Sequence, residues 1–131
     1  MTQTFEQQRA SFAWDCARHG MQRCAKEYKP LAKGAPALIM NSGLLPTLAF
    51  LMTKNEASRL ITDDIVRWLK RRLWNVELQR GRGVGVFSQF MPELHSVDSN
   101  AYLRATDEAL EILKWIRQFV DAVPQEENNN G

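Results

Sequence analysis

Apolar residues recur at helical spacing near both ends of the chain, and this pattern constrains the fold more than any other feature of the sequence. Intervals of three, four or seven residues separate Phe5, Phe12, Cys16, Gly20, Cys24, Tyr28 and Leu31. Similar spacing connects Tyr102, Ala105, Ala109, Ile112, Leu113, Ile116, Phe119, Val120 and Val123. Such stripes are typical of amphipathic helices that bury one face. We therefore predict a long first helix over residues 5–33 and a last helix that Asp98 or Ser99 caps and Pro124 ends.

Glycine and proline divide the segment that follows the first helix. Gly34 is expected to end that helix, and Pro36 suits the first turn of the next one, where its missing N–H is not needed. Residues 36–54 are apolar nearly all round, which predicts a central buried helix. The Asn-Ser-Gly sequence at 41–43 and Pro46 must break or kink it.

Capping residues predict two further helices. Asn55 can cap a short helix over residues 56–60, and Thr62 can cap another that extends to about Trp74. The two residues after Thr62 would then lie in a first helical turn, where carboxylates interact favourably with exposed backbone N–H groups: Asp63 and Asp64.

Residues 75–97 have the weakest periodicity and contain three glycines and a proline. We predict a loop here with one helical turn near residues 87–91, and Val84, Val86 and Phe90 leave a weak strand option open. Together these elements predict an all-α fold, a single-domain bundle of five or six helices.

The chain of 131 residues is long enough for one domain with its own core. Folding can bury about two-thirds of its surface without metal or disulfides. We place the helical domain at residues 1–124 and predict a disordered polar tail at 125–131. No apolar stretch approaches the roughly 20 residues that span a bilayer, and the N-terminus lacks the features of a secretory signal. Cys16 and Cys24 are too far apart on one helix for a disulfide, so we expect reduced thiols and a cytoplasmic location.

The net charge of +2 conceals a segregation of charge along the chain. Residues 18–82 carry 13 Lys and Arg against 5 Asp and Glu, whereas residues 83–131 carry 3 against 8. A basic region of this size is typical of contact with a phosphate backbone, and such binding would weaken steeply with salt. Helical spacing places Arg67, Lys70 and Arg71 on one face.

The predicted phosphate contacts are the basic side chains of this region: first Arg67, Lys70, Arg71, Lys26 and Lys54, then Arg18, Arg23, Lys29, Arg80 and Arg82. Trp68 and Trp74 interleave with them and could stack on bases. A plainer interpretation is that the charges form solvated helix faces and that both tryptophans belong to the core.

The sequence predicts no catalytic, metal or cofactor site, and we expect a protein that is not an enzyme. Cys16, His19 and Cys24 share one side of a helix, but they lack a fourth ligand, and buried structural cysteines explain them better. Residues 81–85 lack the preceding hydrophobic strand of a phosphate-binding loop, so we interpret them as a flexible basic loop. Two adjacent acidic pairs suit a helix start and a solvated helix face rather than a two-metal centre: Asp63 and Asp64, Asp107 and Glu108.

Two blocks of sequence carry a family pattern. The first is PALIMNSGL at 36–44, followed by TLAFL at 47–51 and by Lys54, with Tyr28 in the basic segment ahead of it. The second consists of YLRAT, EAL and LKWIRQF between residues 102 and 119. In order and spacing these blocks resemble the small subunit family of the type III-B (Cmr) CRISPR RNA-guided effector complex. The resemblance covers residues 5–54 and 98–123.

The resemblance implies an all-helical, non-catalytic subunit of an antiviral defence complex. Several copies of such a subunit stack end to end, line the groove beside the guide RNA paired with its target RNA, and hold the backbone through basic side chains. The implied partners are the guide RNA, the target RNA, further copies of the chain, and the backbone and large subunits. Other subunits cut the target RNA. The segregated charge also suits head-to-tail stacking of a basic surface on an acidic last helix.

A helical protein-protein adaptor with no direct RNA contact is the alternative function. In that case Trp68 and Trp74 would form a surface for a protein partner, and the positive charge would serve steering or solubility. Neither function involves a membrane.

Overall fold

The computed structural model describes residues 2–124, which form six α-helices. In chain order they are α1 (Phe5–Ser42), α2 (Leu44–Met52), α3 (Glu56–Trp74), α4 (Arg82–Gly85), α5 (Phe87–Ser96) and α6 (Ser99–Ala122). These residues contain no strand, so the predicted all-α bundle of five or six helices is confirmed. The tail that we predicted to be disordered lies outside the described residues.

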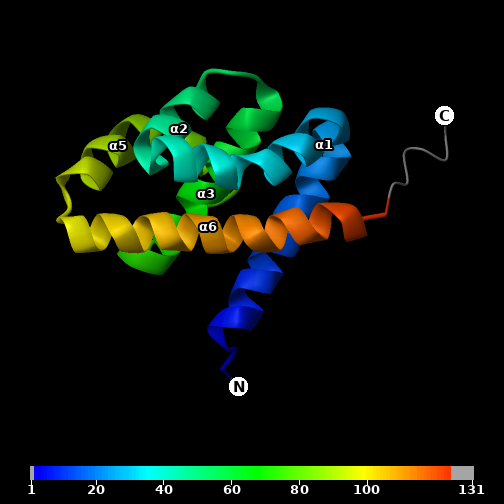
Figure 1. Cartoon of the computed structure of the whole chain (residues 1–131). Coiled ribbons are helices and arrows are strands. Elements are labelled where there is room, and N and C mark those ends of the chain that lie inside the picture. The colour runs from blue at the N-terminus through cyan, green and yellow to red at the C-terminus, as the bar shows by residue number, and fades with distance from the viewer. Residues whose placement is uncertain (1, 125–131) are drawn as a thin grey trace.

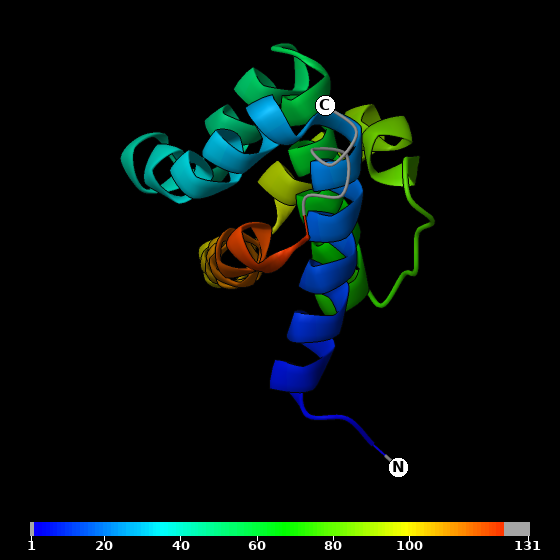
Figure 2. The same cartoon turned by 90° about the vertical axis from the view of Figure 1, so that its right-hand side faces the viewer.

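Three long helices set the shape of the molecule (Figures 1 and 2). α1 leads away from the N-terminus and bends, and its second half crosses the molecule above α6 in Figure 1. α3 lies alongside the first half of α1, as Figure 2 shows. α1 makes its most extensive contacts with α6 and its next most extensive with α3. Of the shorter helices, α2 packs against α1 and α3, α4 packs against α3, and α5 packs against α2 and α4.

The bend in α1 is a local break in the helix at Cys24, whose backbone angles are φ −157° and ψ 60°. Tyr28 shows how sharp the bend is. Its hydroxyl donates a hydrogen bond of 3.2 Å to the carbonyl of Cys16, twelve residues earlier, although twelve residues of straight helix span about 18 Å. The ring folds back onto Gly20, where a Cβ atom would lie 2.3 Å from two ring atoms. Only a residue without a side chain fits at this position.

Gly34 does not end α1, so this prediction is wrong. The helix continues through Gly34 and Pro36 to Ser42, although glycine costs a helix about 1 kcal/mol and proline about 3 kcal/mol. Burial of the neighbouring residues outweighs these costs, because one face of this part of the helix lies entirely in the core: Ala32, Ala35 and Ile39.

Gly43 separates α1 from α2 and confirms the break that we predicted at 41–43. Its φ of 92° is a backbone conformation that residues with side chains rarely adopt. Pro46 does not break α2, contrary to our prediction. It lies in the first turn, where its missing N–H would have had no partner within the helix.

α3 is one helix rather than two. Asn55 caps it as predicted, because its side chain accepts a hydrogen bond of 2.8 Å from the backbone N–H of Ser58. Thr62 caps nothing: its hydroxyl donates to the carbonyl of Ser58, one turn earlier in the same helix, at 2.9 Å. The predicted helix start at Thr62 is therefore wrong, and Asp63 and Asp64 lie buried in the middle of a helix.

The segment between α3 and α6 is more helical than predicted. α3 ends at Asn75, which has a left-handed φ of 57°. Residues 82–85 form α4, and the predicted turn at 87–91 extends to Ser96 as α5. Asp98 caps α6 as predicted, since its carboxylate accepts a hydrogen bond of 2.9 Å from the backbone N–H of Ala101.

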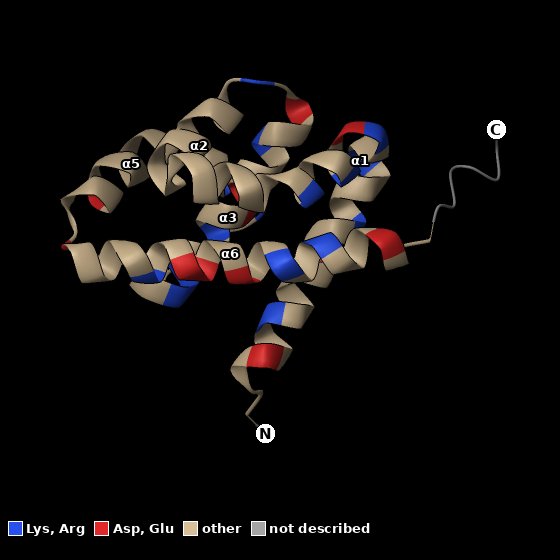
Figure 3. Ribbon diagram, viewed as in Figure 1, with Lys and Arg blue, Asp and Glu red and all other residues tan. Residues whose placement is uncertain are grey.

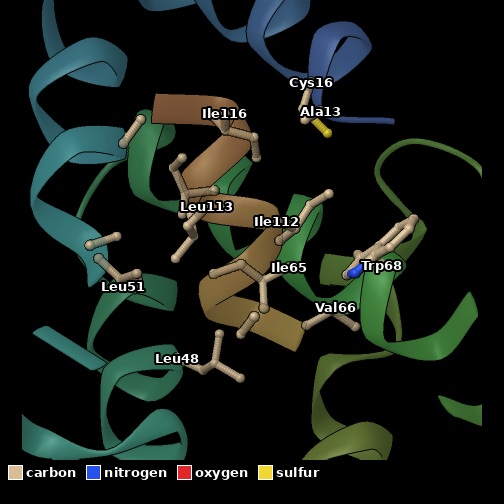
Figure 4. Packing of buried hydrophobic residues seen from close by; sticks show 14 of the residues in the cluster. Ala13, Cys16, Leu48, Leu51, Ile65, Val66, Trp68, Ile112, Leu113 and Ile116 are labelled. Carbon is tan, nitrogen blue, oxygen red and sulfur yellow. The ribbon is translucent and has the colours of Figure 1, made fainter. Parts of the chain in front are cut away.

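One hydrophobic core lies between α1, α2, α3 and α6 (Figure 4). Ile65 and Trp68 of α3 occupy its centre together with Ile112 and Ile116 of α6, and all four are fully buried. None of the helices formed by residues 2–124 combines the length and apolar character that crossing a membrane requires.

Gly20→Ala should destabilise the protein, because the new methyl group would occupy the place of the Tyr28 ring. The ring cannot swing away freely, since its hydroxyl is hydrogen-bonded to both Asp64 and Cys16. We expect the free energy of unfolding, measured by urea denaturation, to fall by about 2–3 kcal/mol.

Gly34→Ala is the matched control in the same helix. A Cβ atom there has nothing within 4 Å, so the substitution should raise the free energy of unfolding by about 0.5–1 kcal/mol. Equal effects of the two substitutions would contradict the tight contact between Gly20 and Tyr28.

Candidate nucleic-acid interface

Arg67, the first of the predicted RNA contacts, is buried, and its side chain is only 6% exposed. Its Nε donates to Oδ2 of Asp63 at 2.8 Å, and a terminal nitrogen donates to Oδ1 of Asp64 at 2.9 Å. We call these three residues the Asp63–Arg67 cluster. Arg67 therefore does not lie at the surface, where a phosphate contact would need it, because Asp63 and Asp64 pair with its guanidinium inside the protein.

The other two cations of the predicted α3 face form contacts within the protein. Lys70, with a side chain 13% exposed, pairs with Glu93 of α5 at 3.0 Å and lies over the ring of Trp74. Arg71 pairs with Glu77 at 3.2 Å. These ion pairs therefore connect the last turns of α3 to α5 and to the segment that follows α3.

The tryptophan side chains of α3 pack mainly within the protein rather than presenting rings on which bases could stack. Trp68 is fully buried, and its Nε1 donates a hydrogen bond of 3.0 Å to Glu108 of α6. Trp74 is half-buried and packs edge to face against Phe90, with ring centres 5.2 Å apart. The Trp68/Trp74 surface considered for an adaptor is not present.

The acidic C-terminal part of the chain pairs with the basic part. Asp121 of α6 lies 3.2 Å from Lys29 and 2.9 Å from Lys33, both of α1. Glu108 lies 3.1 Å from Arg72 of α3. Acidic and basic segments alternate along α6 in Figure 3. Two acidic residues of α6 are thus paired with cations of α1 and α3, and Lys29 is engaged by this pairing.

Asp63 also positions the glycine-rich segment. Its carboxylate accepts hydrogen bonds from the backbone N–H groups of Gly81 and Val84, both at 2.9 Å. Gly83 packs directly on Asp63, where a Cβ atom would lie 2.7 Å from the Asp63 carbonyl oxygen. In place of the flexible loop that we predicted, residues 81–85 are anchored on a buried carboxylate.

A basic surface remains at the bend of α1. Its exposed cations come from α1, from the connection between α2 and α3 with the start of α3, and from the glycine-rich segment. We call it the basic face, and it consists of Arg18, Arg23, Lys26, Lys54, Arg59, Arg80 and Arg82. Six of the ten predicted contacts lie here, whereas Arg67, Lys70, Arg71 and Lys29 do not.

Ion pairs occupy only two members of the basic face. Arg23 pairs with Glu56, and Arg80 pairs with Asp15. The other five have no ion-pair partner among residues 2–124: Arg18, Lys26, Lys54, Arg59 and Arg82. Arg59 is not among the predicted contacts, although it lies in the first turn of the helix that Asn55 caps.

A cavity of about 710 Å³ opens within the basic face. α1 contributes His19 and Arg23 to its wall, and the other segments contribute Lys54, Arg59 and Arg80. A smaller hollow of about 310 Å³ lies between Lys26 and Lys54. Burial lowers the pKa of His19, and the nearby Arg80 lowers it further. The cavity is therefore a site of positive electrostatic potential.

Cys16, His19 and Cys24 do not come together as a metal site. Burial raises the pKa of the Cys16 thiol, which lies in the core, whereas His19 lines the cavity and Cys24 lies at the bend. Nowhere in residues 2–124 are three or more His, Cys, Asp or Glu side chains placed to hold a metal ion.

Comparison with known proteins places the chain among CRISPR-associated sequences. A family model described as "CRISPR-associated protein (Cas_Cmr5)" matches residues 5–123. A crystal structure of a CRISPR-associated Cmr5 family protein from Thermus thermophilus matches with a TM-score of 0.71 and 22% sequence identity. The match covers 93% of this chain and 98% of that chain, so the two share a fold.

Asp64 should make the stability of the protein depend on pH. Burial raises its pKa to about 6, against the opposing effects of Arg67 and of the hydrogen bond from Tyr28. Between about pH 4 and 6 the folded protein therefore binds a proton that the unfolded chain releases, and stability falls as pH rises. Relative to Asp64→Asn, the wild type should lose about 3 kcal/mol of unfolding free energy across this window, measured by urea denaturation.

Asp107→Asn, at an exposed position of α6, is the control for loss of a carboxyl group. This variant should reproduce the wild-type pH profile. If the difference in unfolding free energy between the wild type and Asp64→Asn stays constant from pH 4 to 7, the pKa of Asp64 is not raised.

Proposed function

Because the chain belongs to the CRISPR-associated Cmr5 family, we propose that it is a non-catalytic small subunit that holds RNA backbone on its basic face. Family membership supports a place in the multi-subunit type III-B Cmr effector complex, and it confirms the resemblance found in the sequence. The proposed ligands are the guide RNA and the target RNA. The proposed protein neighbours are further copies of the chain and the backbone and large subunits.

The unpaired cations of the basic face carry this proposal. Lys and Arg side chains that are not neutralised within the protein can neutralise phosphates and release the counterions of RNA. Segments far apart in the sequence contribute them, since Lys26 comes from α1, Lys54 follows α2 and Arg82 belongs to α4. Contacts to phosphates carry no base sequence information. This suits a complex in which pairing with the guide RNA reads the target.

The buried carboxylates of α3 support a structural role. Asp64 is fully enclosed and accepts hydrogen bonds from Tyr28 and Arg67. Asp63 accepts hydrogen bonds from Arg67 and from the glycine-rich segment. These carboxylates hold the fold together, which agrees with a subunit that leaves RNA cleavage to other members of the complex.

Exposed apolar side chains support the proposed contacts with neighbouring subunits. Met40 at the end of α1 is 75% exposed, and Phe50 of α2 is 51% exposed. Methionine and aromatic residues are enriched where protein interfaces are buried. These side chains support stacking better than an acidic last helix does, because Glu108 and Asp121 are paired within the chain.

The same apolar side chains also suit a helical adaptor that contacts proteins and no RNA. The two functions differ in one measurable property, which is salt-dependent binding of RNA by the basic face.

Replacing Arg18, Lys26 and Arg82 together with alanine should weaken RNA binding to the same extent for unrelated sequences. Loss of three phosphate contacts should flatten the slope of log K against log salt by about two units and lower affinity roughly a hundredfold at 0.1 M salt. Filter binding of two unrelated single-stranded RNAs at several salt concentrations measures both effects. The assay uses the full chain and then the assembled effector complex.

The matched control replaces Arg104, Lys114 and Arg117 of α6 with alanine. It removes the same number of Arg and Lys groups from exposed positions that have no ion-pair partner in the described chain. RNA binding should stay close to that of the wild type. Equal losses in the two variants would contradict the role of the basic face, and RNA affinity of the complex that is independent of both would favour the adaptor.

A further inference from the structure

We propose that the cavity within the basic face binds one nucleotide, with its phosphate on Lys54 and Arg59 and its base against Met52 and Leu60. If the nucleotide is part of a bound RNA strand, with its base turned out of the stack of neighbouring bases, the site deepens the proposed function and rests on it. A free mononucleotide offers the same chemistry from a second source. The experiment below separates the two sources.

The cavity has an excess of positive charge. Four cations lie in its wall against two carboxylates: Arg23, Lys54, Arg59 and Arg80, Glu56 and Asp63. Glu56 pairs with Arg23. Asp63 is engaged by a guanidinium and two backbone N–H groups. An entering anion therefore meets Lys54 and Arg59, neither of which has an ion-pair partner in residues 2–124.

The rest of the lining favours a nucleotide over inorganic phosphate. One side of the cavity is apolar and consists of Met52, Leu60 and Val84. A nucleotide base can pack against these side chains, whereas a free phosphate ion cannot. The volume of about 710 Å³ lies in the range of sites that enclose small organic ligands, which combine apolar walls with a few polar groups. The cavity thus offers one region for each half of a nucleotide.

The walls of the cavity are fixed by hydrogen bonds within the protein. The carboxylate of Asp63 holds Gly81 and Val84 in place. The reciprocal hydrogen bonds between Asn55 and Ser58 hold the connection that carries Lys54. A preformed site loses little free energy to ordering when a ligand binds.

His19 is a natural reporter for this site. It lines the cavity, where burial lowers its pKa; Arg80, Arg23 and Arg67 lower the pKa further, and Asp15 opposes them. A phosphate bound beside it would raise the pKa. His95 is exposed on α5 and does not line the cavity, so it serves as the internal reference.

Titration of the full chain with adenosine monophosphate, followed by NMR of the histidine rings, tests the proposal. The His19 signals should shift saturably and the His19 pKa should rise, while the His95 signals stay in place. Inorganic phosphate should bind about tenfold more weakly, because it has no base to bury.

Arg59→Ala should weaken adenosine monophosphate binding roughly tenfold by removing a charge-assisted contact to the phosphate. Arg117→Ala removes the same group from an exposed position on α6 and is the matched control. Its affinity for the nucleotide should equal that of the wild type.

A short single-stranded RNA distinguishes the two sources. If the RNA shifts the His19 signals and competes with adenosine monophosphate, the cavity takes a nucleotide of the strand. If only the mononucleotide shifts them, the cavity takes the free ligand. Either result supports a nucleotide site.

Three results would overturn the proposal: His19 signals that respond to neither ligand, equal binding of inorganic phosphate, or equal binding of a tetraglutamate peptide. If the cavity fails while RNA binding still depends on Arg18, Lys26 and Arg82, the proposed function stands without the nucleotide site. Loss of both would remove the proposed function as well.

Discussion

A buried group of charges on α3, the Asp63–Arg67 cluster, determines how the rest of the molecule is arranged. Asp64 accepts a hydrogen bond of 2.9 Å from the hydroxyl of Tyr28, which holds the second half of α1 against α3. Asp63 accepts the backbone N–H groups of the segment 81–84, which holds α4 against α3. The bend of α1 and the glycine-rich segment form two sides of the cavity. One cluster therefore fixes the shape of the basic face from inside.

The cluster contributes more to geometry than to stability. Two carboxylates share one guanidinium, and burial raises the pKa of Asp64 to about 6. Removing one partner of a buried ion pair typically costs about 3–5 kcal/mol, whereas replacing a whole cluster with apolar residues is often neutral or stabilising. Apolar residues would not reproduce the directional hydrogen bonds to Tyr28 and to residues 81–84. We therefore interpret the main role of the cluster as positioning Tyr28 and residues 81–84.

The long helices and their caps could be predicted because their signals are local. The caps Asn55 and Asp98 and the break at Gly43 depend on residues within one turn, and the apolar stripes of α1 and α6 repeat from turn to turn. The predictions at Gly34 and Thr62 were wrong because tertiary burial competes with such signals. Gly34 stays helical where its neighbours enter the core, and the hydroxyl of Thr62 bonds back into its own helix.

The charges could be counted from the sequence but not located. Spacing predicts that Arg67 and Lys70 lie near each other on α3, yet it does not show that this side of the helix meets the core. Partners such as Glu93 for Lys70 come from other helices, so pairing becomes visible only in the folded chain. The cations of the basic face that have no ion-pair partner within residues 2–124 lie around the bend of α1 and the cavity beside it. That bend occurs at Cys24, which is neither glycine nor proline. The position of the basic face is therefore a property of the fold, and the basic segment alone does not determine it.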